Sequence, residues 1–165
     1  MRWDKLALAC TLAVYAPLAA AQESLCTADE AVVFSCHVGQ KTVSLCRPAS
    51  LREQLAYRFG MPGHIELAYS APSSGASQTP PQPGFEVSTK PLFGGGVTTL
   101  RFHRGAYRYE VYSKAGRADD ADRTPVAEDG VIVSRDGQTL RHLVCNDSGA
   151  GFREPLGWLP HAAGQ

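Results

Sequence analysis

The side chains best able to do chemistry in this chain are five cysteines and five histidines. A serine nucleophile would be expected on a G-x-S-x-G turn and a zinc protease would carry H-E-x-x-H, and neither pattern occurs. No C-x-x-C pair or closely spaced Cys/His set indicates a metal site. The sequence therefore predicts no catalytic residue, no cofactor and no metal ion. The histidines lie one to a segment, as His37, His64, His103, His142 and His161.

Carboxylates can still act in pairs, as in glycoside hydrolysis, because two such residues need only meet in space. Glu66, Glu86 and Glu110 fall on predicted strands, where alternation makes them solvent-facing residues. The acidic run 119–122 lacks the spacing, the central glycine and the terminal glutamate of a calcium loop. The favoured interpretation is a non-enzymatic binding protein. The alternative is a small envelope hydrolase or a carbohydrate-binding module.

The first 21 residues have the three parts of a secretory signal peptide. Arg2 and Lys5 precede an apolar stretch that ends in three alanines at 19–21, after which cleavage is expected. Cleavage removes those two cations and Asp4, so 16 basic residues become 14 and 16 acidic residues become 15. A net charge near −1 gives no electrostatic reason to bind nucleic acid or an anionic membrane. We expect a periplasmic or secreted protein that is a monomer, with 22–165 as a single domain.

Three of the cysteines lie in the run 26–46, which predicts a β-hairpin. Gly39-Gln40 can form its two-residue turn, so that Val38 lies opposite Lys41. Because neighbours alternate and cross-strand partners share a face, this register divides the hairpin into a dry face and a mostly wet face. The dry face holds Val32, Phe34, Cys36, Val43 and Leu45, and the wet face holds Val33, Ser35, His37, Thr42, Ser44 and Cys46.

An even number of cysteines in an exported chain predicts two disulfides, and four cysteines allow three pairings. Cys36 and Cys46 point to opposite faces and are out of register, so they are poor partners. Pairing Cys26 with Cys36 would fold the chain back onto its own strand. The remaining pairing is Cys26 with Cys46, and Cys36 with Cys145.

Three further hairpins are predicted from alternating apolar residues. They cover 55–69 with a turn at 61–63, 97–113 with a turn at Arg104-Gly105, and 131–145 with a turn at Asp136-Gly137. In the second hairpin the inward residues are expected to be Leu55, Tyr57, Phe59, Ile65, Leu67 and Tyr69. In the third they are expected to be Leu100, Phe102, Tyr107, Tyr109 and Val111, with Arg101, His103, Arg108 and Glu110 on the other face.

The connecting segments are assigned by composition. Residues 70–84 are expected to form a mobile surface loop, 85–88 a short strand, 94–96 a glycine turn or bulge, and 114–130 a charged turn. The tail 146–165 is expected either to drape over the domain or to stay loose. Four hairpins in succession, with no helical pattern and no repeat of fixed length, predict an all-β antiparallel meander of about eight to ten strands, closed as a barrel or packed as a two-sheet sandwich.

The cysteine run C-T-A-D-E-A-V-V-F-S-C-x-x-G-x-K-x-V-S-L-C, followed by Y-R-F-G, resembles the opening of a group of small exported bacterial proteins of unassigned activity. The chain is also similar, more loosely, to bacterial periplasmic lysozyme inhibitors, in some of which a Ser-Gly-x-x-Tyr loop enters the cleft of the lysozyme. The nearest match here is Ser148-Gly149-Ala150-Gly151-Phe152, with Phe in place of Tyr.

This second resemblance implies a protein partner, a lysozyme-type hydrolase in particular. The partner-binding residues would be Ser148, Gly149 and Phe152. A second candidate is the tip of the third hairpin, which is basic and exposed in the predicted register. Its residues are Arg104, Gly105 and Arg108.

Overall fold

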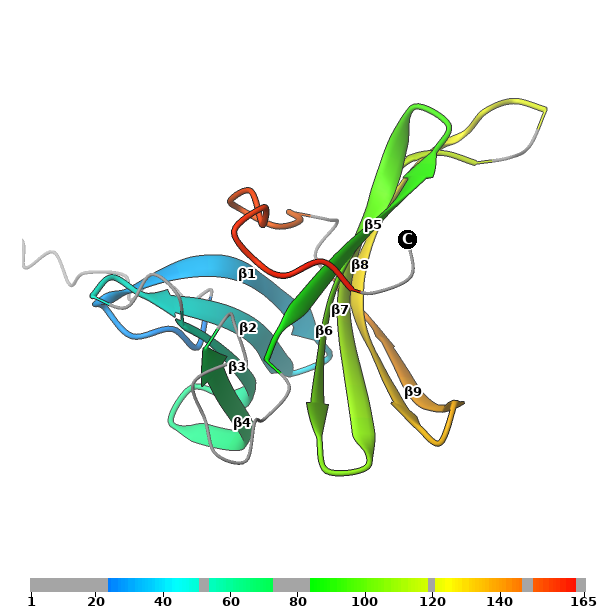
Figure 1. The fold of residues 1–165 in the computed structure, drawn as a ribbon. Coiled ribbons are helices and arrows are strands. Elements are labelled where there is room, and N and C mark those ends of the chain that lie inside the picture. Colours follow the sequence, from blue (N-terminus) through cyan, green and yellow to red (C-terminus); the bar gives the residue numbers. More distant parts are fainter. Residues whose placement is uncertain (1–23, 51–53, 73–83, 119–120, 147–149, 163–165) are drawn as a thin grey trace, which may run out of the picture.

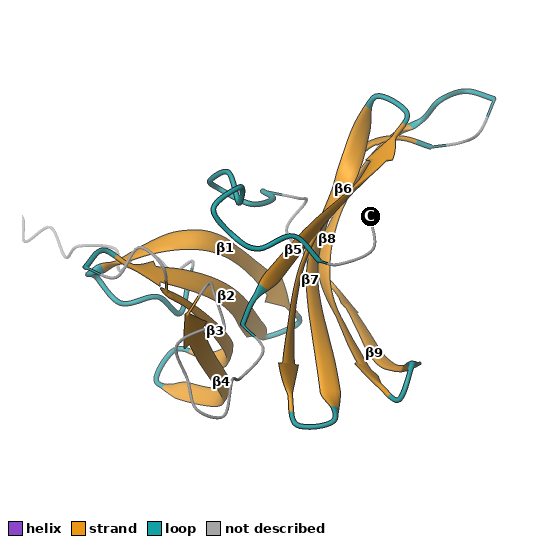
Figure 2. Ribbon diagram, in the orientation of Figure 1, coloured by secondary structure: helices purple, strands orange, loops and turns teal. Residues whose placement is uncertain are grey.

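The computed structural model describes residues 24–50, 54–72, 84–118, 121–146 and 150–162. The described strands form two antiparallel sheets packed as a sandwich, and no helix occurs among the described residues (Figure 1; Figure 2). The predicted all-β class is confirmed, and of the two predicted architectures the sandwich is the one observed. The predicted signal peptide at 1–21 lies outside the described residues. Within the described part of the chain, no helix is long and apolar enough to cross a membrane.

Each sheet is a meander in which every strand pairs with its neighbour in sequence. The first sheet contains β1 (Glu30–Val38), β2 (Lys41–Pro48), β3 (Gln54–Met61) and β4 (His64–Pro72). The second contains β5 (Glu86–Leu92), β6 (Gly95–Arg104), β7 (Tyr107–Arg117), β8 (Pro125–Arg135) and β9 (Gln138–Val144).

The first hairpin has the predicted register, since Val38 pairs with Lys41 and Cys36 with Val43. A bulge between Val32 and Phe34 changes the faces beyond it. Val33, which was predicted to face outward, is therefore fully buried in the core, and Val32 packs beside Cys46 instead.

The prediction that the second face of this hairpin is wet was wrong. Thr42 and Ser44 are 2% and 0% exposed. They are polar but satisfied: the Leu25 backbone N–H donates to Ser44 Oγ at 2.9 Å, and Ser35 and Ser44 share a hydrogen bond of 3.1 Å. The segment before β1 therefore lies against this face, and the hydroxyls find partners that replace water.

A second bulge, between Phe59 and Gly60, changes the faces that were predicted for the second hairpin. Ile65 pairs with Gly60 and is 41% exposed, although alternation placed it inside. Strand β4 also continues to Pro72, so the predicted loop 70–84 begins in a strand, and Ala71 is buried at 4% exposure. Residues 73–83 of that loop lie outside the described residues.

The strands of the second sheet are longer than predicted. β5 extends from the expected 85–88 to Leu92, and β7 and β8 occupy most of the charged segment 114–130. Charge does not prevent strand formation there, because Lys114 and Glu128 are cross-strand partners on the outer face.

The turns of the last two hairpins differ in how well they were predicted. Arg104 pairs with Tyr107, so the third hairpin turns at Gly105-Ala106 and not at Arg104-Gly105. Moving a turn by one residue moves its partners by two, which leaves the alternation of faces unchanged. Tyr107, which was expected to face inward, is nevertheless 38% exposed at the end of its strand. The turn at Asp136-Gly137 is confirmed, with both residues at positive φ, 52° and 78°.

The core lies between the sheets, and the tail closes one side of it. An aromatic cluster of Tyr57, Tyr69, Phe85, Phe102 and Tyr109 occupies the interface. The tail is docked: Arg153 N–H donates to Val33 O at 2.8 Å, Val87 N–H donates to Pro160 O at 2.8 Å, and Leu159 is 3% exposed. In Figure 1 this segment, in red, runs from β1 to β5 across the opening between the two sheets.

Both predicted disulfides are present. Cys26, in the segment before β1, is bonded to Cys46 of β2, and Cys36 of β1 is bonded to Cys145, directly after β9. The second bond therefore joins the two sheets. Beside it, Asn146 N–H donates to His37 O at 2.7 Å.

Candidate functional site

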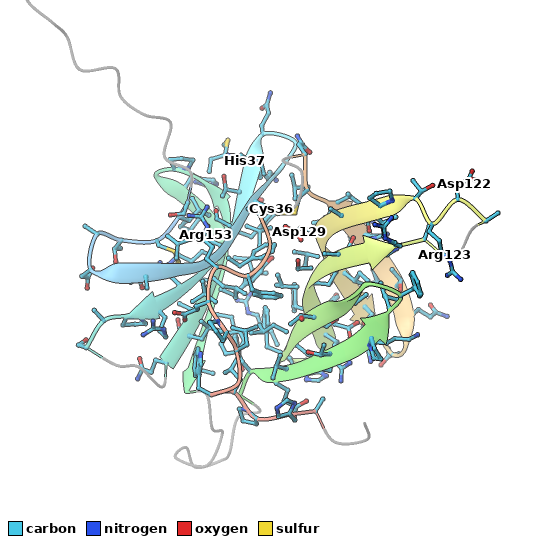
Figure 3. The ribbon with its side chains drawn as sticks, turned by 90° about the horizontal axis from the view of Figure 1, so that it is seen from above. Cys36, His37, Asp122, Arg123, Asp129 and Arg153 are labelled. Carbon is cyan, nitrogen blue, oxygen red and sulfur yellow. A yellow bond between two sulfur atoms is a disulfide. The ribbon has the colours of Figure 1, made fainter. Side chains whose placement is uncertain are left out.

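At Gly151 and Phe152 the predicted Ser148–Phe152 loop packs against the domain and does not form an exposed loop. Ser148 and Gly149 lie outside the described residues. Phe152 is half-buried, and its ring centroid lies 5.3 Å from that of the core residue Phe34. The Gly151 N–H also donates to Asp129 Oδ2 at 2.8 Å. Figure 3 shows the tail, with Arg153, lying along β1. Phe152 thus has a structural role in packing the tail.

The second predicted site, the turn between β6 and β7, is exposed at Arg104 and Gly105. Arg108 is already engaged, because its Nε donates to Ser134 Oγ at 3.1 Å and lies 3.4 Å from Glu110 Oε2. Tyr107, which lies beside it, is 38% exposed, and its ring centroid is 5.6 Å from the guanidinium carbon of Arg135. This end of the sheet therefore offers an exposed arginine and a tyrosine.

The opposite end of the same sheet carries a more exposed aromatic residue. Phe93, in the turn between β5 and β6, is 60% exposed, the highest value among the exposed large hydrophobic residues of the described part. The guanidinium of Arg123, in the loop between β7 and β8, lies 4.3 Å from its ring centroid. We call Phe93, Gly94, Arg117 and Arg123 the protruding tip, because these strand ends and the yellow loop extend well beyond the sandwich (Figure 1).

Backbone contacts hold the tip in shape. Arg117 N–H donates to Phe93 O at 2.9 Å, and Ala118 N–H donates to Thr124 O at 2.8 Å. Arg117 Nη1 also donates to Arg123 O at 3.2 Å. Gly95 allows β6 and β7 to approach closely, since a Cβ there would lie 2.1 Å from Ala115 O. Figure 3 places Arg123 at the end of the sheet remote from the four-stranded sheet.

A groove of about 260 Å³ crosses the outer face of the second sheet. At its centre the Tyr112 hydroxyl donates to Glu128 Oε1 at 2.7 Å and lies 2.8 Å from His142 Nε2. The hydroxyl has one proton, so the contact to His142 must be donated by the histidine, and Nε2 is protonated. We call this site the outer groove. It is lined by Val97, Thr99, Glu110, Tyr112, Lys114, Glu128, Ile132 and His142.

The electrostatics of the outer groove keep Tyr112 neutral. Burial of its side chain raises the pKa of the hydroxyl well above its ordinary value, and the hydrogen bond to Glu128 raises it further. The ring fits because it lies over Gly130, where a Cβ would come within 2.7 Å of the hydroxyl oxygen. Glu110 is paired with Arg101 at 3.0 Å. The groove thus combines apolar surface with a few polar side chains, whose carboxylates already have hydrogen-bond partners.

Sequence reasoning missed both of these sites for the same reason. Each is assembled from strands that are adjacent only once the register is known: Tyr112, Glu128 and His142 come from β7, β8 and β9. The one local signal was Phe93 next to the glycine triplet, an aromatic residue at a turn.

Two other features are structural. A cleft of about 500 Å³ lies between the tail and the β5–β6 hairpin, but the carboxylate of Glu154 on its wall accepts two hydrogen bonds of 2.7 Å from Arg47. Among the described residues one trio is close enough to share a metal ion, Cys26, Glu30 and Cys46. Its sulfurs form a disulfide, and Arg58 binds its carboxylate.

Comparison with known proteins gives no relative. No protein-family model matches the chain, and neither the curated proteins nor the solved structures contain a significant match.

Proposed function

We propose that this chain is an exported binding protein that inserts its protruding tip into the cleft of a partner, with a cell-wall hydrolase of the lysozyme type as that partner. The observation that carries the proposal is the pairing of Phe93 with Arg123: an aromatic ring that is 60% exposed, 4.3 Å from a guanidinium. A few residues supply most of the binding energy in protein interfaces, and aromatic and arginine side chains are enriched at such interfaces.

The shape of the tip suits insertion into a concave site. It extends beyond the sandwich (Figure 1) and is supported by the ends of four antiparallel strands and by the backbone bonds at Phe93 and Ala118. A segment that is ordered before binding loses little conformational entropy when it docks. A small contact area at the tip can therefore give useful affinity.

The charge of the tip suits a glycoside hydrolase. Such enzymes carry a pair of carboxylates in the cleft. Arg117 and Arg123 would bring two guanidinium groups toward that pair, and Phe93 would occupy the apolar surface on which a sugar ring packs. The two disulfides fit an oxidising compartment outside the cytoplasm, where cell-wall hydrolases act.

The proposal is tested by lysis of cell-wall suspensions with c-, g- and i-type lysozymes, each with and without the protein. We expect inhibition of at least one type at about micromolar protein. Undiminished lysis with all three types would overturn the proposed function.

Variants at the two ends of the sheet locate the site. Phe93→Ala should weaken inhibition about tenfold or more, because it removes the exposed ring that would anchor the partner and that Arg123 contacts. Tyr107→Ala at the opposite end is the matched control and should inhibit like the wild type. If Tyr107→Ala weakened inhibition and Phe93→Ala did not, the proposed function would stand but the site would lie at the Arg104-Gly105 turn.

A further inference from the structure

We infer that the outer groove is a second binding site, which takes one uncharged sugar residue through its hydroxyl groups. The inference does not rest on the proposed function, because the outer groove and the protruding tip share no residue. It rests on how Tyr112, Glu128 and His142 are joined, and on how the charges around them are paired.

The hydrogen bonds of the outer groove are fixed in direction. His142 Nε2 donates to the Tyr112 hydroxyl at 2.8 Å, and that hydroxyl donates to Glu128 Oε1 at 2.7 Å. The second carboxylate oxygen of Glu128 remains as an acceptor, and Nδ1 of His142 is a further polar atom for a ligand. Lys114, from the same lining, supplies donors. A sugar hydroxyl both donates and accepts, so it matches such a mixed set better than a purely donating or accepting ion does.

The charges of the outer groove do not favour an ion. Glu110 is paired with Arg101 at 3.0 Å and with Arg108 at 3.4 Å. Glu128 lies directly across the strands from Lys114. Each carboxylate therefore has a cationic residue on the same face, so neither sign of charge dominates the outer groove and an ion gains no clear advantage over an uncharged ligand.

Size and surface favour a single ring. A volume of about 260 Å³ is near the lower limit for small-molecule sites, so it holds one sugar residue and not a chain. Val97 and Ile132 provide apolar surface for the C–H face of the ring. Tyr112 is 6% exposed and lies over Gly130, so it contributes its hydroxyl and not a stacking surface. Without a stacking residue we expect affinity near the millimolar range.

The test is a titration followed by amide chemical shifts of the protein, with four probes. N-acetylglucosamine and glucose are uncharged, glucuronate is an anion and glucosamine is a cation. We expect saturable shifts with an uncharged sugar at about millimolar concentration, centred on Tyr112, Gly130 and His142. An absence of saturable shifts with both uncharged sugars up to about 50 mM would overturn the inference. Binding of either ion about tenfold tighter than the uncharged sugars would also overturn it.

Variants separate the groove from the rest of the surface. Tyr112→Phe keeps the ring over Gly130 but removes the hydroxyl that joins the other two side chains, so it should weaken binding about tenfold. His103→Ala, an exposed histidine of the same sheet outside the groove, is the control and should bind like the wild type. Equal binding by Tyr112→Phe and the wild type would remove the site. Phe93→Ala should leave sugar binding unchanged, which keeps this result distinct from the test of the protruding tip.

Discussion

Glu30 and Arg58 form a bidentate ion pair that reaches across β2 from β1 to β3. Arg58 Nη2 donates to Glu30 Oε1 at 2.8 Å, and Arg58 Nη1 donates to the other carboxylate oxygen and to Leu25 O. Thr27 N–H donates to the same carboxylate at 2.8 Å. The pair therefore fastens the segment before β1, with Cys26, onto the first sheet.

This pair predicts a loss of stability in acid. The hydrogen bond from Arg58 lowers the pKa of Glu30 from 4.5 to about 2. The unfolded chain takes up a proton near pH 4.5, whereas the folded chain resists until about pH 2, so the stability from this group is present above that range and is lost as pH falls through it. Glu30→Gln should lower the free energy of unfolding at pH 7 by about 1–2 kcal/mol, allowing for solvent screening of the partly exposed Arg58.

Urea unfolding between pH 7 and pH 2.5, with disulfides intact, checks this prediction. The wild-type and Glu30→Gln curves should converge toward the acid end. Glu66→Gln is the control, because the Lys41–Glu66 pair is exposed at 42% and 31% and should contribute less than about 0.5 kcal/mol. Parallel curves for wild type and Glu30→Gln would contradict the assigned role of the pair.

Gly130 gives a second prediction for a single residue. A Cβ at this position would lie 2.5 Å from the backbone oxygen of Leu143 as well as 2.7 Å from the Tyr112 hydroxyl. A backbone oxygen in a paired strand cannot move aside, so Gly130→Ala should destabilise the fold by about 2–3 kcal/mol. Gly157→Ala, with nothing within 4 Å of its added Cβ, should change stability by less than about 0.5 kcal/mol. Equal thermal midpoints for the two variants would contradict this packing.

At the scale of strands and turns, local chemistry was predictable and bulges were not. The Asp136-Gly137 turn and the inward position of Cys36 follow from residue type and alternation. Val33 and Ile65 were misplaced because each lies beside a bulge, which adds one residue and reverses the faces beyond it. No residue type marks the first bulge, whereas the second lies at Gly60, a glycine within a strand at φ 150°, and that signal was in the sequence. The outer groove was beyond prediction for a related reason, since cross-strand neighbours depend on registers that the bulges and turns set.

The tail is an element without regular structure, and its packing was left open by its composition. Leu156 and Leu159 are 7% and 3% exposed, and both belong to the main core. Leu159→Ala should lower the free energy of unfolding by about 2–4 kcal/mol, because it leaves a cavity at the open side of the sandwich. The neighbouring Trp158, at 36% exposure, is the control, and Trp158→Ala should cost less than about 1 kcal/mol.

Urea unfolding of both tail variants measures the difference. If Leu159→Ala were as stable as the wild type, the tail would not be part of the core, and the role of Phe152 in packing against Phe34 would lose its support.

For the whole molecule, the two sheets are held together by the shared core, by the tail and by one disulfide bond. Each sheet is an independent meander, and no strand of one sheet pairs with a strand of the other. Cys36–Cys145 crosses between them with a sequence separation of 109, whereas Cys26–Cys46 closes 20 residues within the first sheet. The two bonds therefore constrain the unfolded chain to different extents.

Removing the bonds one at a time should reveal this difference. In the chain-entropy model the longer loop contributes up to about 5 kcal/mol and the shorter one up to about 3 kcal/mol. A variant with Cys36→Ala and Cys145→Ala should therefore be less stable than one with Cys26→Ala and Cys46→Ala, by about 1–2 kcal/mol in urea unfolding. The first variant should also expose the interface between the sheets at lower urea, seen as earlier binding of a hydrophobic dye, because it removes the disulfide that crosses that interface. The opposite order of stability would contradict this prediction. It would mean that the Cys26–Cys46 bond, together with the Glu30–Arg58 pair, stabilises the sandwich more than the disulfide between the sheets does.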